Sequence, residues 1–258
     1  MSYHTPKISL LFRLCFVCFV CCFNSVANSA SIDFSTDDQG NTLVNGQAIA
    51  SPEEFGNLVS ISASAATGAA IFDSTPGGPN TRPETEDLLV GLGNVLIVQS
   101  HVFPEQTTPG IFDTPSDATQ GGTLFFDFVS PSRLESITLV DIDENANAEV
   151  RLTDTAGNAR VYSVPNHWTN DGRVGPNGFA ELDLTSLENQ AGETDQLATA
   201  MEDPGFDANM VTQLQVTLFG SGAVDNLVFV PEPSSAALSL PLVLFVVASL
   251  RNRQRRRS

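Results

Sequence analysis

Residues 123–129, TLFFDFV, alternate in the way that decides the fold. Successive side chains of a β-strand point to opposite faces, so Leu124, Phe126 and Phe128 share one face and Asp127 lies on the other. The same alternation recurs elsewhere in the chain, in Ile137 and Leu139, Val150 and Leu152, Leu214, Val216 and Leu218, and Leu227 and Phe229. Short alternating runs of this kind indicate half-buried strands of an antiparallel sheet.

Turn sequences separate these runs, among them Asn45-Gly46, Asp171-Gly172 and Asn177-Gly178. Gly and Asn adopt the backbone conformations that tight turns require. Helical periodicity is nearly absent, although residues 187–201 are open to a short helix or a long loop. The pattern predicts an all-β protein, an antiparallel β-sandwich of one domain at residues 31–229.

The body of the chain, residues 31–230, is strongly acidic. Five of the 12 basic residues and 29 of the 30 acidic residues fall within it, so its formal charge is −24, against −18 for the whole chain. Nucleic-acid binding depends on neutralising phosphates with Lys and Arg, so this balance argues against it. The acidity fits either solubility or the attraction of divalent cations. All four cysteines lie within the first 22 residues, which leaves the body without disulfides or thiolate ligands.

The N-terminus has the order of a secretory signal peptide. Lys7 and Arg13 precede an apolar run at residues 14–23, LCFVCFVCCF, and small and polar residues follow up to Ala30. Such a run is too short to span a bilayer, which takes about 20 residues. We therefore expect residues 1–30 to direct export through the secretion translocon and to be removed by signal peptidase after Ser29 or Ala30.

The C-terminal segment, residues 230–258, combines three elements in order. Val230, Pro231, Glu232 and Pro233 precede an apolar span at residues 236–250, AALSLPLVLFVVASL, and a basic end follows with Arg251, Arg253, Arg255, Arg256 and Arg257. Arginines directly after an apolar span place the body across the membrane from the cytoplasm. As a transmembrane helix the span reaches about 22 Å against a hydrocarbon core of roughly 30 Å. This marginal anchor suits temporary retention.

The tail resembles the PEP-CTERM sorting signal of exported bacterial proteins. The resemblance implies that exosortase, a membrane-embedded transpeptidase, recognises and cleaves it near Glu232. It also implies a role beside exopolysaccharide and biofilm production, at the cell surface or in the extracellular matrix after an initial membrane-tethered stage. An ordinary single-span anchor is the alternative.

The first and last strands of the body, Ile32-Asp33-Phe34 and residues 223–229, resemble the edge strands of jelly-roll carbohydrate-binding modules and galactose-binding-like domains. The resemblance implies a jelly-roll sandwich in which the two strands lie close together and the tail leaves directly from the last one. In such modules a structural Ca²⁺ often joins these strands, which makes Asp33 and Asp225 a candidate metal pair.

A second metal candidate is the segment 141–147, DIDENAN, in which Asp141 and Asp143 offer oxygen ligands at alternate positions. It departs from an EF-hand loop because Ala146 and Leu152 stand where the turn glycine and the closing glutamate belong. For both candidates a solvated turn or a backbone-capping aspartate is the alternative. Structural Ca²⁺ is the only cofactor that the sequence suggests.

A sugar site is a further candidate around Trp168, the single tryptophan of the chain. It lies among Asn166, His167 and Asp171 on an expected loop. An exposed aromatic ring can stack on a pyranose while neighbouring polar groups bond its hydroxyls. The alternative is that Trp168 caps the end of the core.

The common catalytic motifs are missing from the sequence. It contains no G-x-S-x-G, H-E-x-x-H or phosphate loop, and the body has only two histidines, His101 and His167. Among so many acids, chance carboxylate pairs are inevitable and do not indicate glycoside hydrolysis. We therefore expect no catalytic residues and a non-enzymatic structural or adhesive protein. A carbohydrate-binding module and a glycan-processing enzyme are the alternatives.

Overall fold

The computed structural model describes residues 29–49, 55–143, 147–170 and 178–232. In these residues it contains one short 3-10 helix, η1 (Pro83–Leu88), and thirteen strands: β1 (Ala30–Ile32), β2 (Ala48–Ile49), β3 (Val59–Ala63), β4 (Ala69–Asp73), β5 (Asn94–Val98), β6 (Gly122–Val140), β7 (Ala148–Asp154), β8 (Ala159–Val164), β9 (Phe179–Asp183), β10 (Gln190–Ala191), β11 (Leu197–Glu202), β12 (Val211–Leu218) and β13 (Ala223–Pro231). The prediction of an all-β protein is confirmed.

Both predicted sorting segments lie largely outside this part of the chain. The structure describes neither the signal-peptide residues 1–28 nor Pro233, the span 236–250 and the arginines that follow it. Within the residues that are described, no helix has the length and apolar character needed to cross a membrane.

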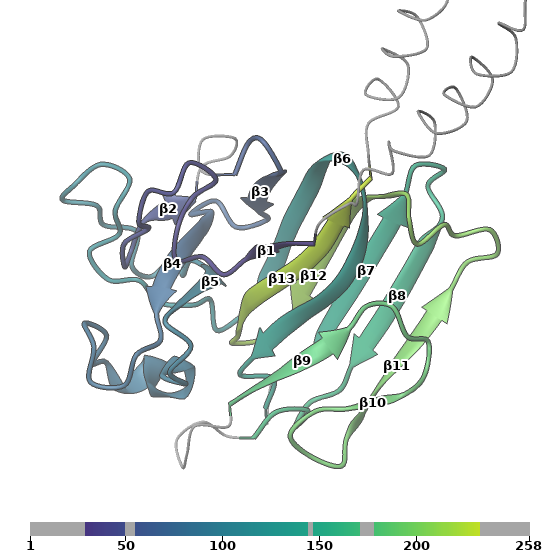
Figure 1. Cartoon of the computed structure of the whole chain (residues 1–258). Helices are drawn as coiled ribbons and strands as arrows, with labels where there is room; N and C mark the ends of the chain where they lie inside the picture. Colours follow the sequence, from purple (N-terminus) through teal and green to yellow (C-terminus); the bar gives the residue numbers. More distant parts are fainter. Residues whose placement is uncertain (1–28, 50–54, 144–146, 171–177, 233–258) are drawn as a thin grey trace, which may run out of the picture. The chain divides into compact units, whose positions relative to one another are not determined.

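All strand pairs are antiparallel, and the strands join one hydrogen-bonded sheet (Figure 1). Its order is β10-β11-β8-β7-β12-β6-β13-β5-β4-β2, with β1 beside β13 and with β3 and β9 beside β6. The long strand β6 contains 19 residues and pairs with different strands along its first and second parts. Its first part pairs with β3 and β12, whereas its second part pairs with β9 and β13.

A bend in the middle of β6 explains this change of partners. Gln213 of β12 pairs with Asp127, but Val211 pairs with Ser132, so β6 carries extra residues around Pro131. Proline has no N–H to donate to a ladder and is typical of such irregularities. Figure 1 shows β6 as a long, curved strand. The single sheet thereby folds over itself, which is consistent with a β-sandwich.

The main core lies between the two parts of the sheet and contains the alternating residues that the sequence indicated. Leu124 and Phe126 are 0% exposed and Phe128 is 8% exposed, whereas Asp127 is exposed. The rings of Phe128 and Phe229 meet edge to face with their centroids 5.1 Å apart. Burial of each such side chain stabilises the fold by about 1.5–3 kcal/mol, which makes this contact between β6 and β13 a principal source of stability.

A second apolar cluster covers the other face of β4 and β5. Phe72 and Ile97 point into it, where they meet Leu88 from η1 and Phe112 from the long connection between β5 and β6. These two strands therefore bury side chains on both faces. This explains why AAIFD and NVLIV read as continuous apolar runs without alternation.

The terminal strands lie side by side, as the jelly-roll resemblance implied. Ala30 pairs with Phe229 and Ile32 pairs with Leu227. Two details differ from the sequence prediction. The first strand ends at Ile32, because Phe34 has a positive φ of 56° that leaves the extended conformation. The last strand is not an edge, since β6 flanks it on one side and β1 and β5 lie on the other.

Residues 187–201, which the sequence left open to a short helix or a long loop, contain strands instead. The stretch contains β10 and the first five residues of β11, which pair with each other, and β11 also pairs with β8. Leu197 and Met201 are exposed on β11. The alternation that marks a half-buried strand is therefore weak there.

Candidate functional site

Trp168 is part of the core, which agrees with the core-capping alternative and not with an exposed aromatic platform. The side chain is 0% exposed, and its indole Nε1 donates a hydrogen bond to the Gln190 carbonyl at 3.1 Å. Gly192 packs so closely that an added Cβ would lie 2.7 Å from an indole carbon. With both faces enclosed, this ring cannot stack on a sugar.

The other predicted sugar ligands surround this buried ring without forming a site with it. Asn166 and His167 are exposed, and Asp171 lies outside the described residues. His167 has a φ of 58°, and its backbone N–H donates to the Asp143 carbonyl at 3.0 Å. The segment 167–169 thus pairs with the chain around Ile142, which is why Trp168 turns inward.

The first metal candidate, Asp33 with Asp225, is brought together by the pairing of β1 and β13. Asp225 is 2% exposed, and its Oδ1 has no hydrogen-bond partner in the described part of the chain. Its Oδ2 accepts a bond from the Asn226 amide at 3.0 Å. Burial raises the pKa of Asp225 to about 7, and the negative charge of Asp33 adds to this effect.

Asp33 itself is exposed, and its Oδ1 caps the backbone N–H of Ser35 at 3.0 Å. It therefore matches the capping alternative, whereas Asp225 does not. The pair supplies one exposed and one buried carboxylate. These are few ligands for a Ca²⁺ ion, which takes six to eight oxygens.

The second metal candidate separates into two residues with different environments. Asp141 follows the last residue of β6, has a φ of 61° and is 1% exposed. Neither of its carboxylate oxygens has a hydrogen-bond partner among the described residues. Asp143 is half-buried, and its backbone carbonyl accepts from His167. The two described carboxyls of the segment therefore lie in different environments, and residues 144–146 lie outside the described residues.

Asp141 has acidic neighbours that sequence reasoning missed, Asp117 and Asp87. Asp117 is 3% exposed, and its Oδ2 accepts bonds from the Ser221 hydroxyl and, at 3.0 Å, from the Gly222 N–H. Ser221 and Asp117 are 104 residues apart in the chain, so no local pattern connects them. The only sequence signal is an acid beside a turn, which is too common to select these residues.

Burial and mutual repulsion shift the pKa values of these carboxyls upward. Burial raises the pKa of Asp141 to about 9, and the charges of Asp87, Asp143 and Asp117 add to the increase, whereas the nearby Ser221 hydroxyl opposes it. Burial also raises the pKa of Asp87 to about 6, with the charge of Asp117 as the next cause. The pKa of Asp117 is raised by burial as well, although the bonds from Ser221 and Gly222 oppose the shift. The cluster therefore favours either protons or a cation.

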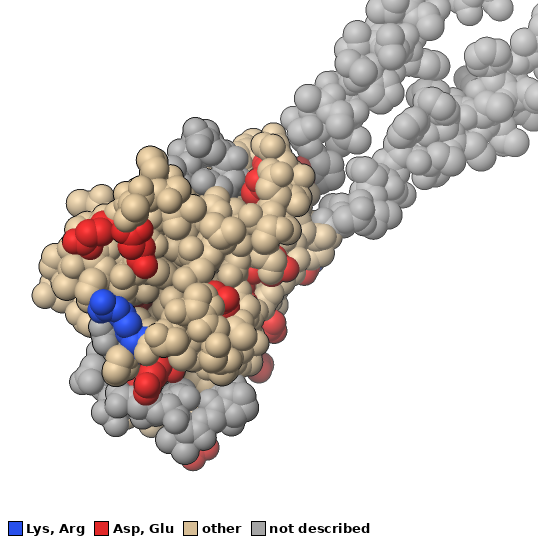
Figure 2. All heavy atoms as spheres, turned by 90° about the vertical axis from the view of Figure 1, so that its left-hand side faces the viewer, with Lys and Arg blue, Asp and Glu red and all other residues tan. Residues whose placement is uncertain are grey.

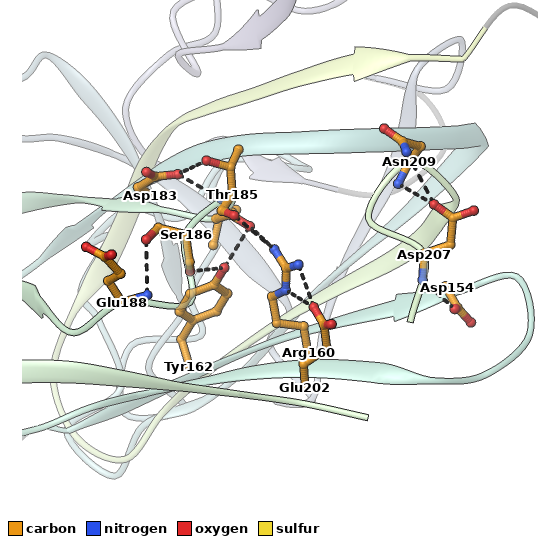
Figure 3. Close-up of polar contacts among 11 residues, drawn as sticks. Asp154, Arg160, Tyr162, Asp183, Thr185, Ser186, Glu188, Glu202, Asp207 and Asn209 are labelled. Atoms are coloured by element: carbon orange, nitrogen blue, oxygen red, sulfur yellow. Dashed lines mark hydrogen bonds and ion pairs between the residues drawn. The ribbon is translucent and has the colours of Figure 1, made fainter. Parts of the chain in front are cut away.

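Arg160 forms a second buried polar group, on β8, which is structural in character (Figure 3). Its guanidinium binds Glu202 through Nε at 2.8 Å and Nη2 at 2.5 Å, and it donates to the Leu184 carbonyl at 2.8 Å. The Tyr162 hydroxyl donates to the same carbonyl at 2.7 Å. These bonds hold the segment after β9 against β8 and use all three guanidinium nitrogens.

Asp154 is a buried aspartate with a complete set of partners. Its Oδ1 accepts from the N–H groups of Ala156 and Asn158, and its Oδ2 accepts from the Asn158 amide and from the N–H of Asp207. These bonds lower its pKa even though burial opposes the effect. The fold can therefore satisfy a buried carboxylate, which makes the unbonded oxygens of Asp141 informative.

The described part of the chain offers no ready-made metal site with many charged ligands. Within the described ranges, no three side chains of His, Cys, Asp or Glu gather closely enough to hold a metal ion. On the face seen in Figure 2, acidic side chains are scattered rather than gathered in one patch. A cation bound by the described residues would rely on one or two carboxylates together with hydroxyl, carbonyl or water oxygens.

Comparison with known proteins gives no relative for this chain: no family model, no curated protein and no solved structure matches it.

Proposed function

We propose that the chain is an exported, acidic β-sandwich protein that is sorted at the cell envelope through its PEP-CTERM-like tail. Its role is structural or adhesive and non-enzymatic, in a surface layer or matrix that contains exopolysaccharide. The observation that carries this proposal is the sequence of the tail. Val230-Pro231-Glu232-Pro233, an apolar span and five arginines follow one another in this order. The partners are the secretion translocon, signal peptidase and an exosortase-type transpeptidase.

The end of the folded unit supports tail removal. Val230 and Pro231 pair with Arg133 and Ser132 of β6, and the N–H of Glu232 donates to the Pro131 carbonyl at 2.9 Å. The last described strand thus extends into the Pro-Glu-Pro element. Cleavage after Glu232 removes no residue of the sheet, so the body keeps its fold after processing.

The start of the folded unit likewise supports removal of the leader. Ala30 is the first residue of β1 and lies opposite Phe229 of β13. Cleavage after Ser29 leaves this strand complete, whereas cleavage after Ala30 shortens it by one residue. Both processing points then lie at the same end of the β1–β13 pair, and we assign the sandwich to the jelly-roll type on this basis.

The buried position of Trp168 argues against a carbohydrate-binding module that uses this ring. The chain has no other tryptophan, and the predicted sugar ligands around Trp168 do not converge on an accessible ring. Contact with polysaccharide is therefore assigned to the acidic surface as a whole rather than to one aromatic pocket.

Intact mass spectrometry of the protein from the native envelope and medium tests this proposal. The expected species begins at Ala30 or Ser31 and ends near the Pro-Glu-Pro element, and any added mass identifies what the new C-terminus is joined to. A matched control is a chain that stops at Glu232, which has the same folded unit and should appear only in the medium without added mass. A mature species that still contains Arg257 would mean an ordinary membrane anchor and would refute the sorting proposal.

A further inference from the structure

Four segments that are distant in the sequence meet around Asp141. The preceding residue, Val140, pairs with Ala223 of β13 and with Phe179 of β9. An added Cβ on Gly222 would lie 3.1 Å from the Val140 carbonyl, so the turn before β13 packs directly against the end of β6. Asp117 reaches the same turn through its bonds from Ser221 and Gly222. Asp117 and Asp141 therefore flank one turn.

Asp141 is buried without hydrogen bonds from the described residues to its carboxylate oxygens. It is 1% exposed, and within the described chain no donor bonds either of its oxygens. Asp154, at 3% exposure, accepts bonds from four N–H donors instead. A buried polar group without a partner costs stability, and a buried charge without one costs more. A positively charged partner at Asp141 would therefore offset this cost in stability.

The charges around Asp141 also favour a positively charged partner. The charged groups that act most strongly on its carboxyl are all acids, Asp87 on η1, Asp143 two residues further on, and Asp117. The Ser221 hydroxyl has a single proton, and it donates this proton to Asp117. Its oxygen lone pairs remain available, so the surroundings of Asp141 offer oxygen atoms and negative charge.

We propose that Asp141 and Asp117, together with the Ser221 hydroxyl, bind a divalent cation at the junction of β6 and β13. Oxygen-only ligands select hard cations, and a mixed set of carboxylate, hydroxyl and water oxygens suits Ca²⁺ better than Mg²⁺, which demands near-ideal octahedral geometry. Asp87 and Asp143 contribute charge from further away. With only two carboxylate ligands the site is weak, with a dissociation constant of about 10⁻⁴ to 10⁻³ M. This site does not depend on the sorting proposal.

Trp168 provides a local probe of this site. It is the only tryptophan of the chain, and the next residue, Thr169, exchanges two hydrogen bonds with Ile142, beside Asp141. Thermal unfolding of the full chain in detergent micelles, followed by tryptophan fluorescence, therefore reports directly on the segment that holds the cation. At a Ca²⁺ concentration ten times the dissociation constant, we expect the melting temperature to rise by about 3–6 °C relative to EDTA.

The Asp141→Asn variant should lose this increase, because the amide removes the charge that attracts the cation. Asp195→Asn is the matched control: it makes the same change at an exposed aspartate and should retain the full increase. Asp225→Asn should also retain it. If Asp141→Asn does not fold, equilibrium dialysis of the unaltered chain and of Asp117→Asn supplies the answer, with one bound Ca²⁺ expected in the former and at least a tenfold weaker affinity in the latter.

An unchanged melting temperature of the unaltered chain in Ca²⁺ between pH 7 and 9 would overturn the proposal and leave a proton on Asp141 instead. An equal increase in Asp141→Asn, or an increase that only Asp225→Asn abolishes, would also overturn it, the latter in favour of the Asp33 and Asp225 pair.

Discussion

Replacing Trp168 by alanine should destabilise the protein by about 4–6 kcal/mol. The side chain is 0% exposed and is enclosed by Gly192 and the core, so its removal leaves a large cavity. Truncation of buried Phe or Trp to Ala costs about 3–5 kcal/mol. Loss of the indole bond to the Gln190 carbonyl at 3.1 Å adds about 1 kcal/mol, because this partly buried acceptor loses its partner.

Urea unfolding of the full chain in detergent, followed by far-UV circular dichroism, measures this loss without relying on the deleted fluorophore. Phe219→Ala is the matched control, because this aromatic side chain is 54% exposed and its loss should cost less than about 0.5 kcal/mol. Trp168→Phe keeps an apolar ring but not the indole N–H, and it should lie between the two. The total stability of a domain is about 5–15 kcal/mol, so this milder variant stays measurable if the alanine variant unfolds. A cost of under about 1 kcal/mol for Trp168→Ala would refute the burial argument and restore the exposed sugar platform.

Three further predictions concern buried polar groups and backbone conformation. Arg160→Met should cost about 3 kcal/mol in urea unfolding because Glu202 loses the partner that it binds at 2.5 Å, and a cost near zero would show that the pair contributes nothing. Because burial raises the pKa of Asp225 from 3.8 to about 7, the free energy of unfolding should fall by roughly 3 kcal/mol as pH rises from about 4 to 7. Asp225→Asn should flatten this part of the pH profile, and an identical slope would contradict the assignment. Gly121→Ala should lower the melting temperature sharply, since its φ is 73° and a Cβ would lie 2.0 Å from a backbone oxygen. Gly40→Ala is the control with a φ of 83° and open space, and it should cost only about 1 kcal/mol.

The strands that sequence analysis identified most clearly are those with one buried face. In β6, β7 and β12 the alternating residues are all buried, because each of these strands packs one face on the common core. The strands that it missed have a different environment. Leu197 and Met201 of β11 are exposed, so the sequence of this strand does not distinguish its two faces.

The candidate site was less accessible to sequence analysis because tertiary contacts create it. Asp117 and Ser221 are 104 residues apart and meet only when the turn before β13 packs against the end of β6. Trp168 was open to two interpretations in the sequence, a sugar platform on a loop and a cap on the core. Its polar sequence neighbours suggested a loop, and two of them are indeed exposed, but pairing with the chain around Ile142 turns the indole into the core.

The acidity of the body has two physical origins that composition alone cannot separate. Among the described residues, most acids are at least partly exposed and contribute net charge, but Asp117, Asp141, Asp154 and Asp225 are buried. Full hydrogen bonding lowers the pKa of Asp154, so the stability that it provides is present above the ordinary aspartate pKa and is lost as pH falls through the lowered value. Asp141 and Asp225 act in the opposite direction, because stability is lost as pH rises toward their raised pKa values of about 9 and about 7.

These opposing terms should place the maximum of stability on the acidic side of neutrality. A cation at Asp141 would change only one of them. It favours the ionised carboxylate, so Ca²⁺ should recover stability above pH 7 and have little effect near pH 4, where the proton already occupies Asp141. A Ca²⁺ effect of equal size at both pH values would instead indicate binding to the exposed acids. The pH dependence of the Ca²⁺ effect therefore distinguishes a buried site from a general response to charge.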